Sequence, residues 1–224
     1  MQKTPFKNLS NWQLRVISAI FIGFVFITII FLIRFLFLIL ISGIASGMLI
    51  EWYDMSNKKK FYLYLGLLLI PIPISCLFYI SINDKTGWLL FLFFATIWSI
   101  DSIAMFVGRI IKGPKLAPKI SPKKTISGFL GGIAVASIIP ILLDLILLTN
   151  VINYKLTSYH FAFFAVIAQM SDLLLSFFKR KFNIKNSGNI IPGHGGLLDR
   201  FDSIILTAPM AAFYLHSQLE LSAI

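Results

Sequence analysis

The sequence has little charge and almost no cysteine, and both shortages exclude broad classes of protein. Asp, Glu, Lys and Arg together make up 13% of the 224 residues, whereas they make up about 25% of a soluble globular domain. The single Cys76 excludes an internal disulfide framework and a cysteine-rich metal cluster. We also find no Ser-His-Asp arrangement and no P-loop. The chemistry should therefore depend on positioning, cations and metal, as phosphoryl or nucleotidyl transfer does.

Long apolar stretches fill most of the chain. Hydrophobic residues make up 58% of it and the mean hydropathy is +0.86, values typical of an integral membrane protein. We predict an all-α, polytopic membrane protein with about seven transmembrane helices, because a helix needs roughly 20 apolar residues to cross hydrocarbon. Arg34 separates the first two spans, which could instead form a tight hairpin or one long interfacial element. The expected spans cover residues 16–33, 35–50, 61–82, 88–108, 128–149, 158–178 and 202–219.

The distribution of basic residues supports this count. With the N-terminus in the cytoplasm, seven spans place 17 of the 20 Lys and Arg residues on the cytoplasmic side and leave Arg34, Lys85 and Lys155 outside. The positive-inside rule predicts such an asymmetry. The net charge of +11 therefore reports topology and contact with lipid headgroups. We expect no nucleic-acid partner, because such a partner would need a soluble basic face.

The two halves of the chain differ in character. Residues 1–87 consist mostly of apolar spans joined by short turns, and we interpret them as N-terminal scaffold spans. Residues 88–224 carry loops rich in Lys, Arg, Gly and Pro, and acidic residues within or against the spans. We interpret this part as the catalytic region of what is, overall, a single membrane domain.

The last cytoplasmic loop, from Ser176 to Asp202, combines cations, glycines and acids between two apolar segments. Its PGHGG stretch places glycines where the backbone turns sharply or approaches a ligand closely. We expect Leu197 to open a helix, so that Asp199 and Asp202 share one helical face. Two such carboxylates suit Mg²⁺, which commonly binds one or two carboxylates together with substrate phosphates. Alternatively, Asp199 pairs with a nearby lysine and Asp202 caps the last span.

Two further aspartates lie inside predicted spans. Asp172 is followed one turn later by Ser176. Lys179 and Arg180 follow after about two turns, so that these side chains approximately share one helical face. An ionised carboxylate at this depth needs a cation or a metal as its partner. The second aspartate, Asp101, is either half of an ion pair that fixes helix packing or a direct ligand.

The preceding cytoplasmic loop is strongly cationic. Prolines recur every four residues at positions 114, 118 and 122, which disfavours helix and favours an extended loop. Its basic residues could hold phosphates or anionic headgroups, or could serve only to set topology. These residues are Arg109, Lys112, Lys115, Lys119, Lys123 and Lys124.

The residues of the last loop resemble the signature of the phosphatidate cytidylyltransferases, also called CDP-diglyceride synthetases. The likeness extends over roughly residues 98–210. Three positions depart from the family pattern: Asn186 replaces an aspartate, Ser127 a common glutamate and Met105 a usual tyrosine. The matching residues are Ser176, Lys179, Arg180, Lys185, Pro192, Gly193, His194, Gly195, Gly196, Asp199, Arg200 and Asp202.

The resemblance implies that CTP and phosphatidate react to give CDP-diacylglycerol and pyrophosphate in phospholipid biosynthesis. It implies Mg²⁺ as cofactor, held by Asp172, Asp199 and Asp202, which together with Lys179 and Arg180 would form the catalytic group. His194 either touches a phosphate or is a turn histidine held by its flanking glycines. The expected substrate-binding residues are Arg109, Lys123, Lys124, Ser176, Lys185, His194 and Arg200.

The expected location is the bacterial inner (cell) membrane, with the loops of the site in the cytoplasm and membrane lipid as a partner. Assembly as a homodimer is left open. So are two other functions, a CTP-dependent lipid kinase and a transporter of an anionic solute. A transporter would distribute its charges through the membrane, whereas the charges of this chain gather toward one face.

Overall fold

The computed structural model describes residues 23–32, 34–56, 59–147, 158–188, 190 and 195–223. The chain is mostly helical, which confirms the predicted all-α membrane fold. A short apolar helix, Gly23–Leu32, precedes the others. The longer helices are α2 (Arg34–Met55), α3 (Lys60–Leu69), α4 (Pro71–Asn83), α5 (Trp88–Ile110), α6 (Ile126–Leu147), α7 (Ser158–Lys181) and α8 (Ile204–Ala223).

Within the part of the chain that the structure describes, four helical stretches are long and apolar enough to cross a membrane: Phe35–Met55, Lys60–Asn83, Trp88–Ile110 and Tyr159–Lys181. They coincide with four of the predicted spans. The fifth and seventh predicted spans correspond to α6 and α8, and the first lies partly outside the described residues. The count of seven therefore stays a prediction.

One of these spans is divided at Pro71, where α3 ends and α4 begins. The helical hydrogen bonds continue up to Ile70, whose N–H donates to the carbonyl oxygen of Gly66 at 3.0 Å. Proline has no N–H, so the next bond of the helical ladder cannot form.

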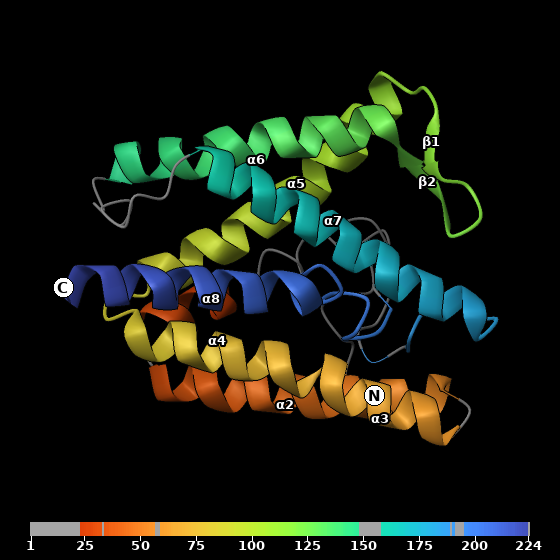
Figure 1. Ribbon diagram of the computed structural model, residues 1–224, viewed down its shortest axis with the longest axis horizontal. Coiled ribbons are helices and arrows are strands. Elements are labelled where there is room, and N and C mark those ends of the chain that lie inside the picture. Colours follow the sequence, from red (N-terminus) through yellow and green to blue (C-terminus); the bar gives the residue numbers. More distant parts are fainter. Residues whose placement is uncertain are drawn as a thin grey trace, which may run out of the picture.

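Helices α5, α6 and α7 form one layer of the molecule (Figure 1). Helix α6 packs closely on α5 because Gly128 has no side chain: a Cβ there would lie 2.4 Å from the carbonyl oxygen of Ala104. Small residues permit such close helix contacts in membranes. The Gln169 side chain on α7 donates to the carbonyl oxygen of Phe129 on α6 at 3.1 Å, which ties the third helix to the pair.

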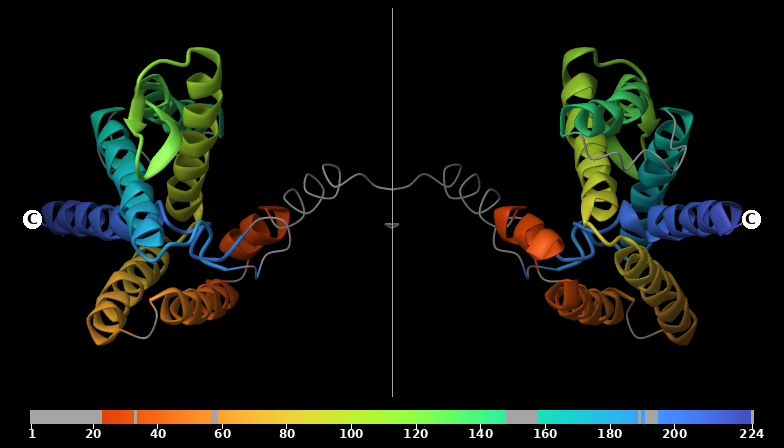
Figure 2. Two further views of the ribbon diagram at one scale, coloured as in Figure 1. Left: turned by 90° about the vertical axis from the view of Figure 1, so that its right-hand side faces the viewer. Right: turned by 90° about the vertical axis from the view of Figure 1, so that its left-hand side faces the viewer.

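Helix α8 lies between this layer and helices α2 to α4 (Figure 2). The largest apolar core joins Phe37 of α2, Leu77 of α4, Phe94 of α5 and Ala208 of α8. The core therefore contains side chains from both predicted halves, while the division into scaffold and catalytic parts of a single domain stays a prediction.

The charged loops gather at one end of the bundle. The connections from α2 to α3, from α5 to α6 and from α7 to α8 lie at the right-hand end in Figure 1, whereas the α4–α5 turn and the C-terminus lie at the opposite end. Lys59, Lys124 and Lys185 are thus far from Lys85 along the helix axes. This arrangement is consistent with the predicted separation of basic residues between the two faces.

Candidate active site

Two aspartates lie at the same depth in neighbouring helices. Helices α5 and α7 both run toward the charged end (Figure 1), and Asp101 and Asp172 each precede the end of their helix by nine residues. At 1.5 Å per residue, both positions are about 13 Å from the helix ends. Carboxylates at this depth need partners, because a charge in hydrocarbon costs several kcal/mol, on the order of 3.

The chain returns to this depth after α7. Ser171, which is fully buried, donates its hydroxyl to the backbone oxygen of Asp202 and accepts the N–H of Leu206 at 3.1 Å. Asp202 therefore lies beside Ser171 and is itself buried. Irregular backbone is tolerated at membrane depth where protein groups satisfy its hydrogen bonds, and Ser171 supplies them here.

The expected helix start at Leu197 is wrong. Helix α8 begins only at Ile204, and Asp199 and Asp202 lie in turns before it. The N–H of Arg200 still bonds to the carbonyl oxygen of Leu197 at 2.9 Å. The ladder then breaks, because the carbonyl of Asp202 binds Ser171 and its carboxylate accepts the N–H of Ser203 at 2.9 Å.

The cationic loop before α6 folds as a hairpin of two antiparallel strands, β1 (Lys115–Ala117) and β2 (Ser121–Thr125). The extended conformation predicted from its prolines is therefore present, with strand pairing added. Lys124 of β2 forms an ion pair with Asp172 of α7, whose other carboxylate oxygen accepts the hydroxyl of Ser176 at 3.2 Å. Asp172 and Ser176 thus share a helical face, as predicted, and are joined by a hydrogen bond.

Arg180 connects this hairpin to the loop after α7. Its Nε donates to the carbonyl oxygen of Ile120 at 3.1 Å, and its Nη1 donates to that of Ile184 at 3.0 Å. The guanidinium is exposed and therefore accessible to an anion, although a phosphate contact stays a prediction.

A second ion-pair cluster centres on Lys179. Its ammonium lies 2.8 Å from Oδ1 of Asp199 and 3.6 Å from Oδ2 of Asp202. The other oxygen of Asp199 accepts the N–H groups of Ser187 at 2.9 Å and Gly196 at 3.1 Å. The pairing of Asp199 with a lysine is the alternative that the sequence left open.

These contacts lower the pKa of the Asp199 carboxyl group. Burial raises the pKa of its carboxyl group, but the hydrogen bond and charge of Lys179, together with the two backbone N–H donors, lower it more. The pKa of Asp199 therefore lies below its ordinary value, and the group is ionised at neutral pH.

The predicted magnesium site does not appear as a cluster of three acids. Among the residues that the structure describes, no three His, Cys, Asp or Glu side chains are close enough together to hold a metal ion. Asp199 is held by three donors, the ammonium of Lys179 and the N–H groups of Ser187 and Gly196. Asp172 is held by Lys124 and Ser176. Asp202 is held by Lys179 and Ser203, and it is close enough to Asp172 for their charges to interact. Hard oxygen donors suit Mg²⁺, so Asp172 and Asp202, which accept fewer hydrogen bonds, fit the ion better than Asp199 does.

Asp101 borders the same group. The buried hydroxyl of Ser203 donates to its Oδ2 at 3.3 Å, and the charges of Arg200 and Lys124 act on it. The structure thus places Asp101 at the site, while its role as ligand or ion-pair partner stays open.

The remaining predicted residues lie around the site or outside the described residues. The side chains of Arg109, Lys123, Lys185 and Arg200 are exposed, and so is Asn186, at which the family aspartate is replaced. His194, together with Pro192 and Gly193, lies outside the described residues.

One carboxylate that the sequence interpretation missed is Glu51, which is 3% exposed. It accepts hydrogen bonds from the hydroxyl of Ser187 and from the N–H groups of Leu197 and Leu198. The predicted span ended at residue 50, which assigned Glu51 to a surface loop. An acid in the last turn of an apolar helix was the available signal, because such a group needs a partner.

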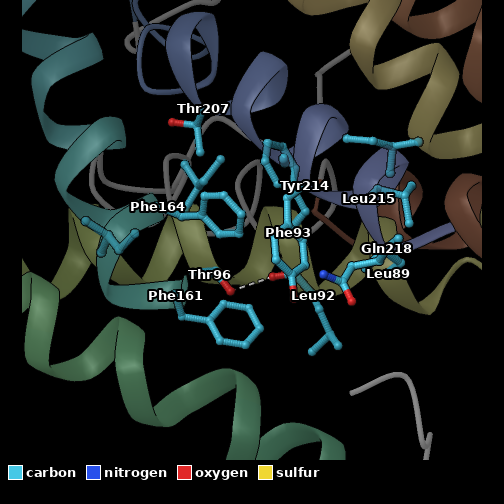
Figure 3. A pocket seen from close by; sticks show the side chains of 14 residues that line it. Leu89, Leu92, Phe93, Thr96, Phe161, Phe164, Thr207, Tyr214, Leu215 and Gln218 are labelled. Carbon is cyan, nitrogen blue, oxygen red and sulfur yellow. Dashed lines mark hydrogen bonds between the residues drawn. The ribbon is translucent and has the colours of Figure 1, made fainter. Parts of the chain in front are cut away.

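An apolar pocket, open on one side, lies among α4, α5, α7 and α8, and Figure 3 shows the side chains that line it. Ile100, next to Asp101 in the chain, and Thr207, one turn after Ser203, line one part of it, and Leu89 and Gln218 line another. The pocket therefore runs from the level of Asp101 and Ser203 toward the ends of α5 and α8 that lie away from the charged loops.

Comparison with known proteins places the chain in a family. The model of the cytidylyltransferase family matches residues 60–218. The chain belongs to this family. The match includes α3 to α7, most of α8 and both ion-pair clusters, so the residues described above lie in the part of the chain that cytidylyltransferases share.

Two curated relatives match nearly the whole chain, and a third matches part of it. A phosphatidate cytidylyltransferase of Rickettsia bellii is 49% identical over 212 residues, which cover 92% of each chain. That of Rickettsia felis is also 49% identical, over 92% of this chain and 93% of its own. That of Bacillus subtilis is 43% identical over 134 residues, 59% of this chain and 49% of its own.

Proposed function

We propose that this chain is a phosphatidate cytidylyltransferase, which converts CTP and phosphatidate to CDP-diacylglycerol and pyrophosphate. The observation that carries the proposal is the convergence of cations and carboxylates from three segments at one depth in the bundle. These segments are β2, α7 and the turns before α8. The family membership and the names of the relatives support it.

The reaction suits a site built from charges. A phosphate oxygen of phosphatidate attacks the α-phosphorus of CTP, the bond to the β-phosphate breaks, and pyrophosphate leaves with the bonding electrons. The attacking oxygen is already anionic, so no strong base is needed. The site must bring two anions together and neutralise the charge on the α-phosphate and pyrophosphate. Lys124 and Lys179 supply positive charge for this purpose.

Lys124 is the better placed of the two to bind a phosphate. Its side chain is 25% exposed, whereas that of Lys179 is 10% exposed and contacts two aspartates. We propose that Lys124 exchanges Asp172 for a substrate phosphate, while Lys179 keeps Asp199 and Asp202 in position.

We further propose that the enzyme uses Mg²⁺, with Asp172 and Asp202 as its protein ligands. Mg²⁺ commonly binds one or two carboxylates and completes its coordination with substrate phosphates and water. When bound, the ion would offset charge on the phosphates. Asp199 organises the adjacent loop instead, since it accepts three hydrogen bonds, two of them from backbone N–H groups of that loop.

The membrane location follows from the helices, and we propose the bacterial inner membrane with the charged loops in the cytoplasm, where CTP is available. One acyl chain of phosphatidate would occupy the apolar pocket, because the lining of the pocket runs from the level of Ile100 and Thr207 toward the opposite end of the bundle. Ala211 lines this pocket, and Ala211→Phe should therefore lower the rate with long-chain phosphatidate more than with short-chain phosphatidate. If Ala211→Phe lowered the rate by the same factor with long-chain and short-chain phosphatidate, this placement would be contradicted.

Incubation of the purified protein with labelled CTP and phosphatidate, with and without Mg²⁺, tests the proposed reaction. We expect labelled CDP-diacylglycerol and one pyrophosphate per product, and loss of both when Mg²⁺ is chelated. Release of CDP together with a phosphorylated lipid would instead indicate a lipid kinase. No chemical change, with uptake of an anion into vesicles, would indicate a transporter. Undiminished synthesis without divalent ions would contradict the role of Mg²⁺.

A further inference from the structure

Glu51 joins the N-terminal region to the loop of the site. It lies in the last turns of α2, within the part of the chain that the sequence assigned to scaffold. Its Oε1 accepts the N–H of Leu197 at 2.8 Å, and its Oε2 accepts the N–H of Leu198 at 2.9 Å and the hydroxyl of Ser187 at 2.8 Å. Hydrogen bonds to a carboxylate are roughly twice as strong as neutral ones.

The loop backbone reaches Glu51 only because glycines are present. A Cβ on Gly196 would lie 2.4 Å from Oε2 of Glu51, and one on Gly188 would lie 2.7 Å from Oε1. Side-chain carbons do not approach oxygen atoms so closely, so any larger residue at Gly188 or Gly196 would displace the carboxylate. Gly196, the second glycine of the Gly195–Gly196 pair, is thus needed so that the loop backbone can lie against Glu51 of α2.

The same loop is held from its other side by Asp199. Ser187 links the two carboxylates, since its hydroxyl binds Glu51 and its N–H binds Asp199. Leu197 and Leu198, which bind Glu51, immediately precede Asp199 in the chain. The position of Asp199 against Lys179 therefore depends on the anchoring of this turn to α2.

We propose that Glu51 is a positioning residue for the transfer reaction. By fixing Ser187, Leu197 and Leu198, it places the turn that carries Asp199 and Asp202 against Lys179. It acts through these residues and does not contact the reacting phosphates. This inference rests on the proposed cytidylyl transfer, but its effect on the loop is measurable without any substrate.

Glu51→Gln is the sharpest test because it keeps the size of the side chain. An amide offers one acceptor oxygen and an NH₂ group, so at least one loop donor would face another donor. We expect kcat to fall about tenfold to a hundredfold, as small displacements of catalytic groups do, with the KM for phosphatidate changed less than about twofold. A rise in that KM with unchanged kcat would overturn the proposal.

Asp54→Asn is the matched control. Asp54 lies on the same helix three residues after Glu51, but it is exposed. We expect its kcat to stay within about twofold of that of the wild type, since an exposed substitution away from the site has little effect. If kcat of Asp54→Asn fell as far as that of Glu51→Gln, the charge on α2, and not the anchoring of the loop, would determine the rate.

Coupling with Ser187 separates positioning from general stability. Ser187→Ala removes one hydrogen bond to Glu51 and should lower kcat by a smaller factor than Glu51→Gln. In the Glu51→Gln background it should have almost no further effect, because groups in one network are not additive. Multiplied losses in the double variant would contradict a shared role. Ser187→Ala also keeps the test decisive if Glu51→Gln fails to insert.

Limited trypsin cleavage at the exposed Lys185 supplies a readout that needs no activity. We expect faster cleavage there in Glu51→Gln than in the wild type or in Asp54→Asn, since the loop loses its anchor. Equal cleavage rates would overturn the inference even if the enzyme is active. If the wild type makes no CDP-diacylglycerol, the proposed function fails, while the cleavage result still decides whether Glu51 holds the loop.

Discussion

The two lysine–aspartate clusters of the site differ in how far they are shielded. Lys124 and Asp172 are 25% and 19% exposed, and their contact joins a hairpin strand to a helix. Lys179, Asp199 and Asp202 are 10%, 10% and 13% exposed, and their contacts join α7 to the turns before α8. An exposed ion pair contributes little to stability, whereas a buried charge without its partner costs several kcal/mol, about 3 to 5.

The difference in exposure indicates that the two clusters have different roles. The Lys179 cluster stabilises the fold, because each of its members would be a buried charge without a partner if the others were removed. The Lys124 pair is able to exchange partners, because its side chains are the more exposed and a substrate phosphate can replace the carboxylate. Substitutions in the two clusters should therefore separate stability from activity.

The largest effect is expected for Lys179→Met. Two buried carboxylates would then lack their cation, so the free energy of unfolding should fall by about 3 to 5 kcal/mol and activity should be lost. The thermal unfolding midpoint in detergent measures the first effect, and product formation from labelled CTP measures the second. If Lys179→Met were inactive but as stable as the wild type, Lys179 would act, like Lys124, on activity and not on stability.

Asp172→Asn should remove activity with a smaller change in stability than Lys179→Met. The substitution takes a charge from the more exposed pair, while it removes a proposed Mg²⁺ ligand. Unfolding midpoints and initial rates at several Mg²⁺ concentrations would be compared with those of the wild type. Full activity would exclude Asp172 from the metal site.

Lowering the pH should weaken the stabilisation that the Asp199–Lys179 ion pair contributes. The pKa of Asp199 is lowered, so its ion pair contributes stability above the unfolded-state pKa of about 3.9 and loses it as pH falls through the lower folded-state value. The difference in unfolding midpoint between the wild type and Asp199→Asn should be constant from about pH 5 to 8 and should shrink below about pH 4. A difference that already shrinks near neutral pH would contradict the lowered pKa.

The smallest effect is expected for Asn186→Asp, which restores the acid of the family pattern. Asn186 is exposed, next to Ser187 in the held loop, so an added charge there is largely solvated. We expect the apparent Mg²⁺ affinity to rise slightly or to stay unchanged, as measured by the Mg²⁺ dependence of the rate. A clear fall in the apparent Mg²⁺ affinity would show that a carboxylate at position 186 disturbs the site and is not merely solvated.

Several features of the site could be predicted from local sequence patterns. Asp172 and Ser176 are one helical turn apart, and their contact follows from helix geometry. The prolines of the cationic loop predicted extended backbone, because proline acts on its immediate neighbours. The gathering of basic loops at one end followed from the counting of spans and charges.

Other features depend on contacts between distant segments, which no local pattern reveals. Helix α8 starts late because Ser171, 31 residues earlier, binds the backbone of Asp202. Glu51 meets a loop that follows it by 136 to 147 residues. Asp199 was expected to bind metal, and only the fold shows that Ser187, Gly196 and Lys179 surround it.

The depth of Asp101 and Asp172 has a consequence for the choice of acceptor. Helix α5 has 23 residues, about 34 Å, and its aspartate lies about 13 Å from the end at the charged loops. In a helix of this length that spans the hydrocarbon layer, such a position lies below the lipid headgroups. Water is scarce at this level, while a lipid phosphate drawn down to it is held at high local concentration. The position of the carboxylates thus favours lipid over water as the attacking group, so that CTP is used for synthesis rather than hydrolysed to CMP.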